Sequence, residues 1–271
     1  MKTKLSLTKK DVTVLLFCVL IMFSCLGTIG NSGRRRAKEI VCLSNLKQWG
    51  TIFEIYTNNN GGQFPIRTSN SGRWMDVMVD LYMPNENIHL CPMTKKLANP
   101  LMKDGIDFWG STFTAWGKIP HADASIYTGR TLGSYGSYGI NCYVYTLVRD
   151  YLYGKPAARF WGTPHITGAS DIPMLLDCYF WCGLPDDDDT PPLFEDWQDR
   201  SDADTMNRFC INRHNGGINC IFMDYAARKI GLKELWTLKW HRNFNTAGPW
   251  TKAGGVQQNS WSDWMREFKE Y

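Results

Sequence analysis

Near the N-terminus, an uncharged apolar stretch is followed by a segment in which apolar residues recur at helical spacing. Val12 to Ile29 contains no charged residue and would extend roughly 27 Å as a helix, close to the thickness of a hydrocarbon core. After the turn-forming residues 30–33, five apolar residues recur at alternating steps of four and three: Cys42, Leu46, Trp49, Phe53 and Tyr56. This spacing predicts an amphipathic helix that ends in the Asn- and Gly-rich residues 58–62. We therefore predict one long N-terminal helix with a transmembrane first half and a second half that packs on a sheet.

The remainder of the chain predicts antiparallel β-structure, because turn signals recur closely between β-branched and aromatic runs. Residues 171–180 form a short apolar run that is typical of a buried strand. Residues 217–224 predict a second strand, with residues 226–232 as its hairpin partner, and residues 261–271 predict a terminal amphipathic helix. The predicted fold class is α+β, a long N-terminal transmembrane helix packed on an antiparallel sheet domain. Its parts are a basic leader-like segment (1–11), the transmembrane helix (12–29), the soluble half of the helix (30–62) and a β-rich globular domain (63–271).

The distribution of charge argues against a nucleic-acid partner, but it does not decide which end of the apolar helix faces the cytoplasm. The net charge is only +4, and seven of the basic residues flank the apolar run: Lys2, Lys4, Lys9, Lys10, Arg34, Arg35 and Arg36. The globular part is therefore not basic, so we expect no nucleic-acid partner. Positive charge on both sides of the run gives no orientation by the positive-inside rule. The cysteine-bearing, turn-rich domain favours a cytoplasmic N-terminus and a periplasmic or cell-surface domain.

Cysteine spacing and catalytic motifs argue against an enzyme. Of the nine cysteines, no pair has C-x-x-C spacing and no Cys/His group has the spacing of a zinc site, so we expect no thiolate metal site. The chain also lacks a G-x-S-x-G elbow, an H-E-x-x-H helix, a P-loop and a dinucleotide-binding glycine pattern. We predict a non-enzymatic protein without catalytic residues.

The layout resembles type IV pilins and type II secretion pseudopilins, and more narrowly the large prepilin-type proteins of planctomycete type. The resemblance lies in the apolar run, in residues 34–48 (RRRAKEIVCLSNLKQ), in residues 56–65 (YTNNNGGQFP), in Cys91-Pro92, and in the His-x9-Asp motif from His214 to Asp224. It implies a membrane-anchored structural subunit of a type II secretion or type IV pilus-like assembly. The implied partners are the inner membrane and other pilin-like subunits or secretion components, and the implied location is the inner membrane with one span.

The same resemblance assigns expected roles to individual residues. It places the processing site at Ser6 and Leu7, and an assembly role at Asp11, whose partner would be the N-terminal amine of a neighbouring subunit. Cys42 and Cys91 lie in the two segments that resemble the family, and we expect them to form a disulfide that pins the first loop to the helix.

His214 and Asp224 are both competent metal ligands, so they form a candidate binding pair. The alternative, which we favour, is structural: His214 satisfies backbone groups at the Asn-Gly-Gly turn and Asp224 caps the hairpin loop.

Two further features leave alternatives open. Asp186, Asp187, Asp188 and Asp189 form an acidic loop that could bind calcium, the single candidate cofactor, although the spacing matches no EF-hand and favours a solvated loop. Twelve tryptophans favour a core filled by large rings. The alternative function is a membrane-tethered module that binds polysaccharide through an exposed row of rings, with these candidates: Trp109, Trp116, Trp161, Trp181 and Trp250.

Overall fold

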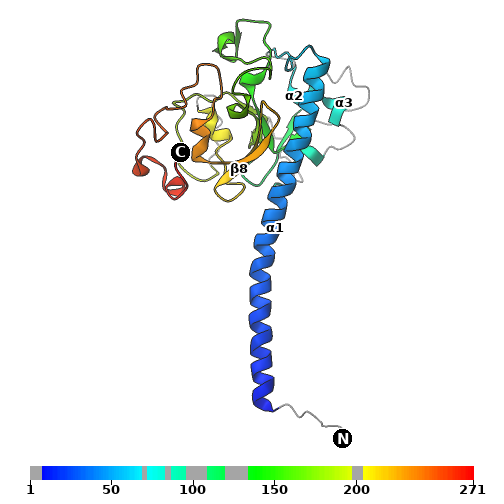
Figure 1. Ribbon diagram of the computed structural model, residues 1–271, viewed down its shortest axis with the longest axis vertical. Coiled ribbons are helices and arrows are strands. Elements are labelled where there is room, and N and C mark those ends of the chain that lie inside the picture. Colours follow the sequence, from blue (N-terminus) through cyan, green and yellow to red (C-terminus); the bar gives the residue numbers. More distant parts are fainter. Residues whose placement is uncertain (1–7, 69–71, 83–86, 96–108, 120–133, 197–203) are drawn as a thin grey trace, which may run out of the picture. The chain divides into compact units, whose positions relative to one another are not determined.

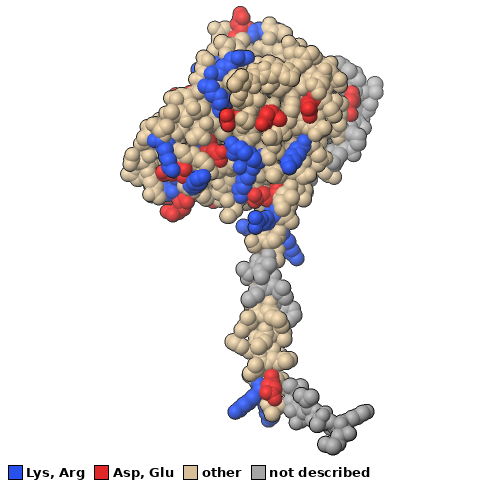
Figure 2. Space-filling model, in the orientation of Figure 1, with Lys and Arg blue, Asp and Glu red and all other residues tan. Residues whose placement is uncertain are grey.

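The computed structural model describes residues 8–68, 72–82, 87–95, 109–119, 134–196 and 204–271. The chain divides into two units, Met1–Lys38 and Glu39–Tyr271, and each is described by itself. On the face of the second unit that Figure 2 shows, acidic and basic side chains are interspersed. No face-wide basic surface is seen there.

Helix α1 (Lys9–Asn59) is continuous through residues 30–33, where the sequence predicts a break (Figure 1). At the start of the helix, the Asp11 carboxylate accepts hydrogen bonds from the backbone N–H of Thr8 (2.8 Å) and from the Thr8 hydroxyl (2.7 Å). These bonds cap the N-terminus of the helix. At its end, the Gly62 N–H donates to the Thr57 carbonyl (2.8 Å) and Gly61 and Gly62 adopt positive φ, a glycine-dependent stop. The predicted stripe is confirmed, because its first four residues are fully buried: Cys42, Leu46, Trp49 and Phe53.

The predicted transmembrane helix is wrong for the chain as described. Among the residues that the structure describes, none of the helices combines the length and the apolar character that crossing a bilayer requires. The side chains described without interruption in the apolar run, Val12 to Met22, extend about 16 Å along a helix, roughly half of a hydrocarbon core. The location and the membrane partner stay predictions from the sequence.

The central sheet has five strands in the order β7-β3-β6-β8-β9. The strands are β3 (Tyr138–Asn141), β6 (Pro173–Asp177), β7 (Cys182–Gly183), β8 (Gly217–Phe222) and β9 (Ala227–Gly231). The strand predicted at 171–180 is thus observed as β6, and the hairpin predicted at 217–232 as β8 and β9. Two-stranded ribbons form from β1 (Trp116–Ile119) with β2 (Ser134–Gly136), and from β4 (Tyr151–Leu152) with β5 (Lys155–Pro156).

The prediction of a purely antiparallel sheet is wrong, because the sheet is mixed. Strands β3, β6, β8 and β9 pair antiparallel, whereas β7 pairs parallel to β3, with Ile140 opposite Cys182. After β6 the four residues 178–181 reverse the chain and carry it to the far edge of β3. A strand that returns from β6 and is placed beyond the antiparallel β3 must run parallel to β3.

The two faces of the sheet belong to two apolar cores. One face holds the stripe of α1 together with Ile140, Leu175 and Ile221. The other holds Ile218 and Cys220 together with residues of the C-terminal segment: Trp236, Trp240, Trp261 and Met265. Successive side chains of β8 alternate between the two cores: Ile218, Cys220 and Phe222 lie in one, and Ile221 lies in the other.

Short helical turns complete the described part of the chain. Two are four-residue α-helices, α2 (Trp74–Val77) and α3 (Val79–Tyr82). The remaining turns are of the 3-10 type: residues 87–89, 142–144, 157–159, 169–171, 205–208, 233–237, 258–260 and 263–265. The terminal helix predicted at 261–271 is wrong, because only Asp263–Met265 forms a helical turn. Aromatic residues at 261, 264 and 268 have modest helix propensity, and their rings are held by packing instead.

Candidate metal centre

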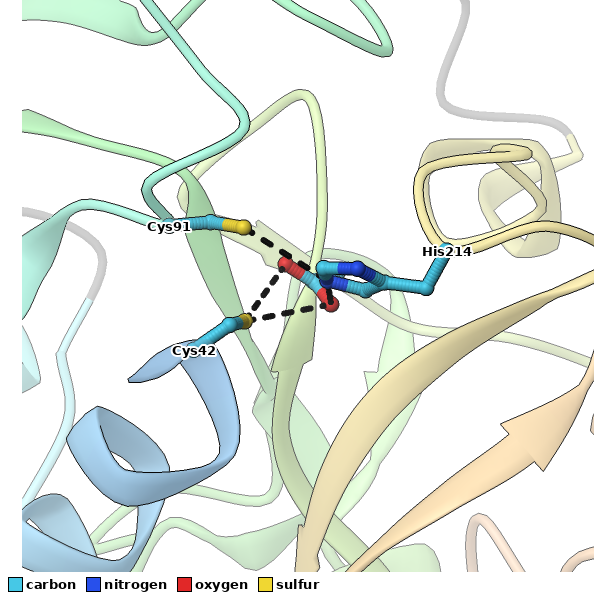
Figure 3. A group of neighbouring side chains, drawn as sticks. Cys42, Cys91 and His214 are labelled. Carbon is cyan, nitrogen blue, oxygen red and sulfur yellow. Dashed lines mark hydrogen bonds and ion pairs between the residues drawn. The ribbon is translucent and has the colours of Figure 1, made fainter. Parts of the chain in front are cut away.

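Four side chains that could bind a metal meet beneath the end of strand β6. They are Cys42 on α1, Cys91 in the segment before Pro92, Asp177 at the last position of β6, and His214 in the turn that precedes β8. We call these four residues the Cys-Asp-His cluster. Figure 3 shows Cys42, Cys91 and His214 converging from separate segments on the carboxylate between them. All four residues are buried, and one ligand atom from each lies within 4.8 Å of the others.

Individual contacts within the Cys-Asp-His cluster are close. The Cys42 Sγ lies 3.6 Å and 3.7 Å from the two carboxylate oxygens of Asp177. The Cys91 Sγ lies 3.5 Å from the His214 Nε2, and the same nitrogen lies 3.1 Å from the Asp177 Oδ2. Thus sulfur, nitrogen and oxygen atoms surround one small volume.

A fully buried arginine neutralises the carboxylate from the other side. Arg213 donates to the Asp177 Oδ1 at 2.9 Å, and neither side chain is exposed to solvent. The rest of its guanidinium donates to four backbone carbonyls, those of Ser111, Thr112, Ser137 and Cys178. Because each donor group has a partner, Arg213 fixes the position of Asp177 and joins β6 to two neighbouring loops.

The charges around the cluster set its ionisation. Burial raises the pKa of Asp177, but His214 and Arg213 outweigh it and lower the pKa to about 2. Burial lowers the pKa of His214, but the Asp177 carboxylate outweighs it and raises the pKa to about 9. The pKa of Cys91 falls to about 7 despite burial, chiefly through its contact with Cys42 and with the cations, whereas burial raises the pKa of Cys42. The surroundings therefore favour a thiolate at Cys91.

The arrangement is not that of a catalytic cysteine. In a Cys-His-acid triad the thiol and the carboxylate contact opposite nitrogens of the imidazole ring. Here the Cys91 Sγ and the Asp177 Oδ2 both contact the Nε2 of His214. Convergence of several donor atoms on one point is the geometry of a binding site for a cation.

The structure brings some of the predicted residues together and separates others. Cys42 and Cys91 are neighbours, but both are free thiols. Asp224 lies beyond the far end of β8, where its carboxylate accepts a hydrogen bond from the Ala226 N–H (3.0 Å) and caps the loop. Asp11 caps its own helix, and the processing residues Ser6 and Leu7 lie outside the described residues.

Sequence reasoning missed Asp177 and Arg213, although both leave a signal. Asp177 is an acid at the end of an otherwise apolar strand, and a buried carboxylate is costly unless it is paired. Arg213 directly precedes His214, yet its partner is 36 residues away in the chain. Zinc motifs that are visible in a sequence have closely spaced ligands, whereas these ligands come from four distant segments.

The acidic loop is partly neutralised by cations of the chain. Asp186 forms ion pairs with Lys155 and Arg159, and the His241 Nε2 lies 3.1 Å from its Oδ1, so its carboxylate is occupied. One oxygen from each of Asp186, Asp188 and Asp189 could lie near a cation, but calcium requires six to eight oxygen ligands.

The buried carboxylate of Asp189 is expected to make the stability of the folded chain depend on pH. It is buried, and its Oδ2 accepts a hydrogen bond from the Met206 N–H (2.8 Å), yet burial raises its pKa to about 7. Below the unfolded-state pKa of about 4, the protonated Asp189 makes its full contribution to the stability of the fold. This contribution is lost as the pH rises towards 7, because ionisation is easier in the unfolded chain. We expect Asp189→Asn to be more stable than the natural chain by about 1–3 kcal/mol at pH 8, with the gap closing towards pH 4.

Urea unfolding at pH 4, 6 and 8 measures this gap. Asp188→Asn, at an exposed position of the same loop, is the control and should stay within about 0.5 kcal/mol of the natural chain at each pH. A gap that does not change with pH would contradict the assignment to Asp189.

The tryptophans proposed as a sugar platform are held by packing. Trp116 is fully buried, and the other four are partly buried. The Trp109 ring stacks on Phe180 at a centroid distance of 4.0 Å, and Trp250 packs on Trp261 at 5.5 Å. None of the five is exposed, so the polysaccharide-binding alternative gains no support.

No protein-family model, curated protein or solved structure matches this chain. Inference about function therefore depends on the residues and their geometry.

Proposed function

We propose that this protein is a non-enzymatic, pilin-like structural subunit whose N-terminal helix bundles with the same helix of other copies. The proposal rests on the exposure of apolar side chains in the first part of α1. Eight large apolar side chains there are exposed: Val12, Val14, Leu15, Leu16, Phe17, Leu20, Ile21 and Met22. Contiguous exposed apolar surface of this kind marks an interaction site.

The apolar surface surrounds the helix. Val14, Leu15, Leu16 and Phe17 are consecutive, and successive residues of an α-helix are turned by about 100°. A helix that is apolar on all sides requires burial on all sides. One partner helix would cover a single side, so several neighbours are needed, as in a bundle.

A second copy of this chain suits the apolar stretch. Between the charged first turn and Arg34, α1 carries no charge, and Figure 2 shows the uncharged, tan-coloured part of this stretch above the charged first turn. A parallel copy in the same register offers an uncharged stretch of equal length and leaves the charged residues of both copies at its ends. No charge is then buried on association, so the large desolvation free energy of burying an ion does not oppose the bundle.

The globular unit is consistent with a structural role. The Cys-Asp-His cluster is enclosed, and all four of its residues are buried. A catalytic metal site keeps one position open for substrate, whereas an enclosed site holds segments together.

Cross-linking through Cys18 tests the proposal. Cys18 lies in the exposed apolar stretch, and it is the one exposed cysteine among the free cysteines that the structure describes. With Cys25 replaced by serine in every sample, a short bifunctional thiol reagent should give covalent dimers of the full chain, and adding Cys18→Ser should abolish them. Sedimentation should show oligomers that the double variant Leu16→Glu/Leu20→Glu converts to monomers.

Val148→Glu is the matched control, because Val148 is 65% exposed, as Leu20 is, but lies in the globular unit. It should leave both readouts unchanged. A natural chain that sediments as a monomer at all concentrations and forms no Cys18-dependent dimer would sink the proposal.

A further inference from the structure

We infer that the Cys-Asp-His cluster binds one zinc ion in a closed tetrahedral site. This inference goes beyond the proposed assembly and does not depend on it, because all four ligands belong to the unit Glu39–Tyr271. The role of the ion is to join the helix α1 to the sheet.

Three of the six distances between ligand atoms are close to the edges of a zinc tetrahedron. With Zn–S bonds of about 2.3 Å and Zn–N or Zn–O bonds of about 2.0–2.1 Å, neighbouring ligand atoms lie roughly 3.3–3.8 Å apart. The Cys91 Sγ and His214 Nε2 are 3.5 Å apart, and the Cys42 Sγ and Asp177 Oδ2 are 3.7 Å apart. The 3.1 Å between the His214 Nε2 and the Asp177 Oδ2 is slightly shorter than the expected edge. Small movements of the side chains would therefore accommodate the ion.

The chemistry of the donors favours zinc over calcium and magnesium. Two cysteine sulfurs, one imidazole nitrogen and one carboxylate oxygen are all zinc ligands. Calcium and magnesium prefer six or more oxygen ligands, so two sulfurs disfavour both. Four protein ligands with full burial are typical of a structural site.

Charge balances when zinc is bound. Two thiolates and the Asp177 carboxylate carry three negative charges, and zinc together with the guanidinium of Arg213 carries three positive charges. His214 is neutral when it binds a metal. An enclosed site with no net charge avoids the high cost of a buried uncompensated charge.

Residues around the cluster orient its ligands, as is usual at metal sites. The Tyr138 hydroxyl donates to the Cys42 Sγ (3.3 Å), and the Asn219 N–H donates to the Asp177 Oδ2 (2.8 Å). The Cys91 N–H donates to the Ser137 Oγ (2.5 Å). These bonds hold three of the four ligands before an ion arrives.

A disulfide between Cys42 and Cys91 is the competing arrangement. Both thiols lie within the same 4.8 Å group, and a disulfide would consume both sulfur ligands. The two arrangements differ in mass, in thiol content and in metal content, so one preparation distinguishes them.

The test measures metal content and the spectrum of a cobalt-substituted sample. The full chain, reduced, incubated with zinc sulfate and desalted, should retain about one zinc per chain by elemental mass spectrometry. Cys91→Ser should lower the retained zinc at least tenfold. Cys210→Ser, a matched control at a buried cysteine outside the cluster, should retain the zinc of the natural chain. With Co²⁺ alone, the natural chain should show thiolate-to-cobalt charge transfer and tetrahedral ligand-field bands.

The cobalt spectrum needs no variant, so it remains informative if Cys91→Ser fails to fold. The inference is overturned if the natural chain retains no zinc and shows no thiolate-to-cobalt band. It is also overturned if Cys91→Ser retains zinc fully, or if the isolated chain has a Cys42–Cys91 disulfide and binds zinc no better after reduction.

Discussion

Chelation of zinc from the Cys-Asp-His cluster is expected to lower the Tm of the full chain by about 8–16 °C. A ligand present at about 1,000 times its Kd stabilises the folded state by about 4 kcal/mol, and each kcal/mol corresponds to roughly 2–4 °C for a domain of this size. The effect is large because the ligands come from four segments that are distant in the chain.

Differential scanning calorimetry with and without EDTA measures this change, and added zinc should restore the higher Tm. Cys91→Ser provides the control, since its Tm should not respond to EDTA. Equal Tm values for the natural chain in EDTA and in zinc would contradict the expected stabilisation.

Replacement of Arg213 is expected to be the most damaging single substitution near the cluster. Arg213→Met removes the guanidinium partner of the buried Asp177 carboxylate, leaves it with His214 alone, and removes donors from four backbone carbonyls. Removing one partner of a buried ion pair costs about 3–5 kcal/mol of unfolding free energy. Arg213→Lys should recover little, because an ammonium cannot reproduce the planar set of donors.

Urea unfolding in EDTA measures the effect of Arg213→Met apart from any change in metal binding. Arg228→Met is the matched control: Arg228 pairs with Glu234, but its side chain is 44% exposed, so the loss should stay below about 1 kcal/mol. A loss for Arg213→Met as small as that of the control would show that the buried pair is dispensable.

The parts of the fold that depend on local periodicity could be predicted from the sequence. The four-and-three spacing of Cys42, Leu46, Trp49 and Phe53 places them on one side of a helix whatever that side packs against. Alternation along β8 and the return of β9 are equally local. The mixed sheet could not be predicted from the sequence, because the direction of β7 depends on which edge of the sheet the chain joins after β6.

The candidate metal site could not be predicted from the sequence for a related reason. His214 and Asp224 belong to one sequence motif, but the six-residue strand β8 lies between them and spans roughly 20 Å when extended. They therefore lie at opposite ends of the strand and cannot share an ion. The carboxylate beside His214 is Asp177, which reaches it through the antiparallel pairing of β6 with β8.

The position of Cys42 along α1 has a mechanical consequence. Cys42 is the first residue of the helix, among those whose side chains the structure describes, to be fully buried. Glu39 contacts Asn219 and Lys229, so tension transmitted along α1 would reach these contacts first, and Cys42 would be the first fully buried position to bear it. A metal–thiolate bond at that point would resist pulling more firmly than apolar packing does, and would let the helix act as a tether under load.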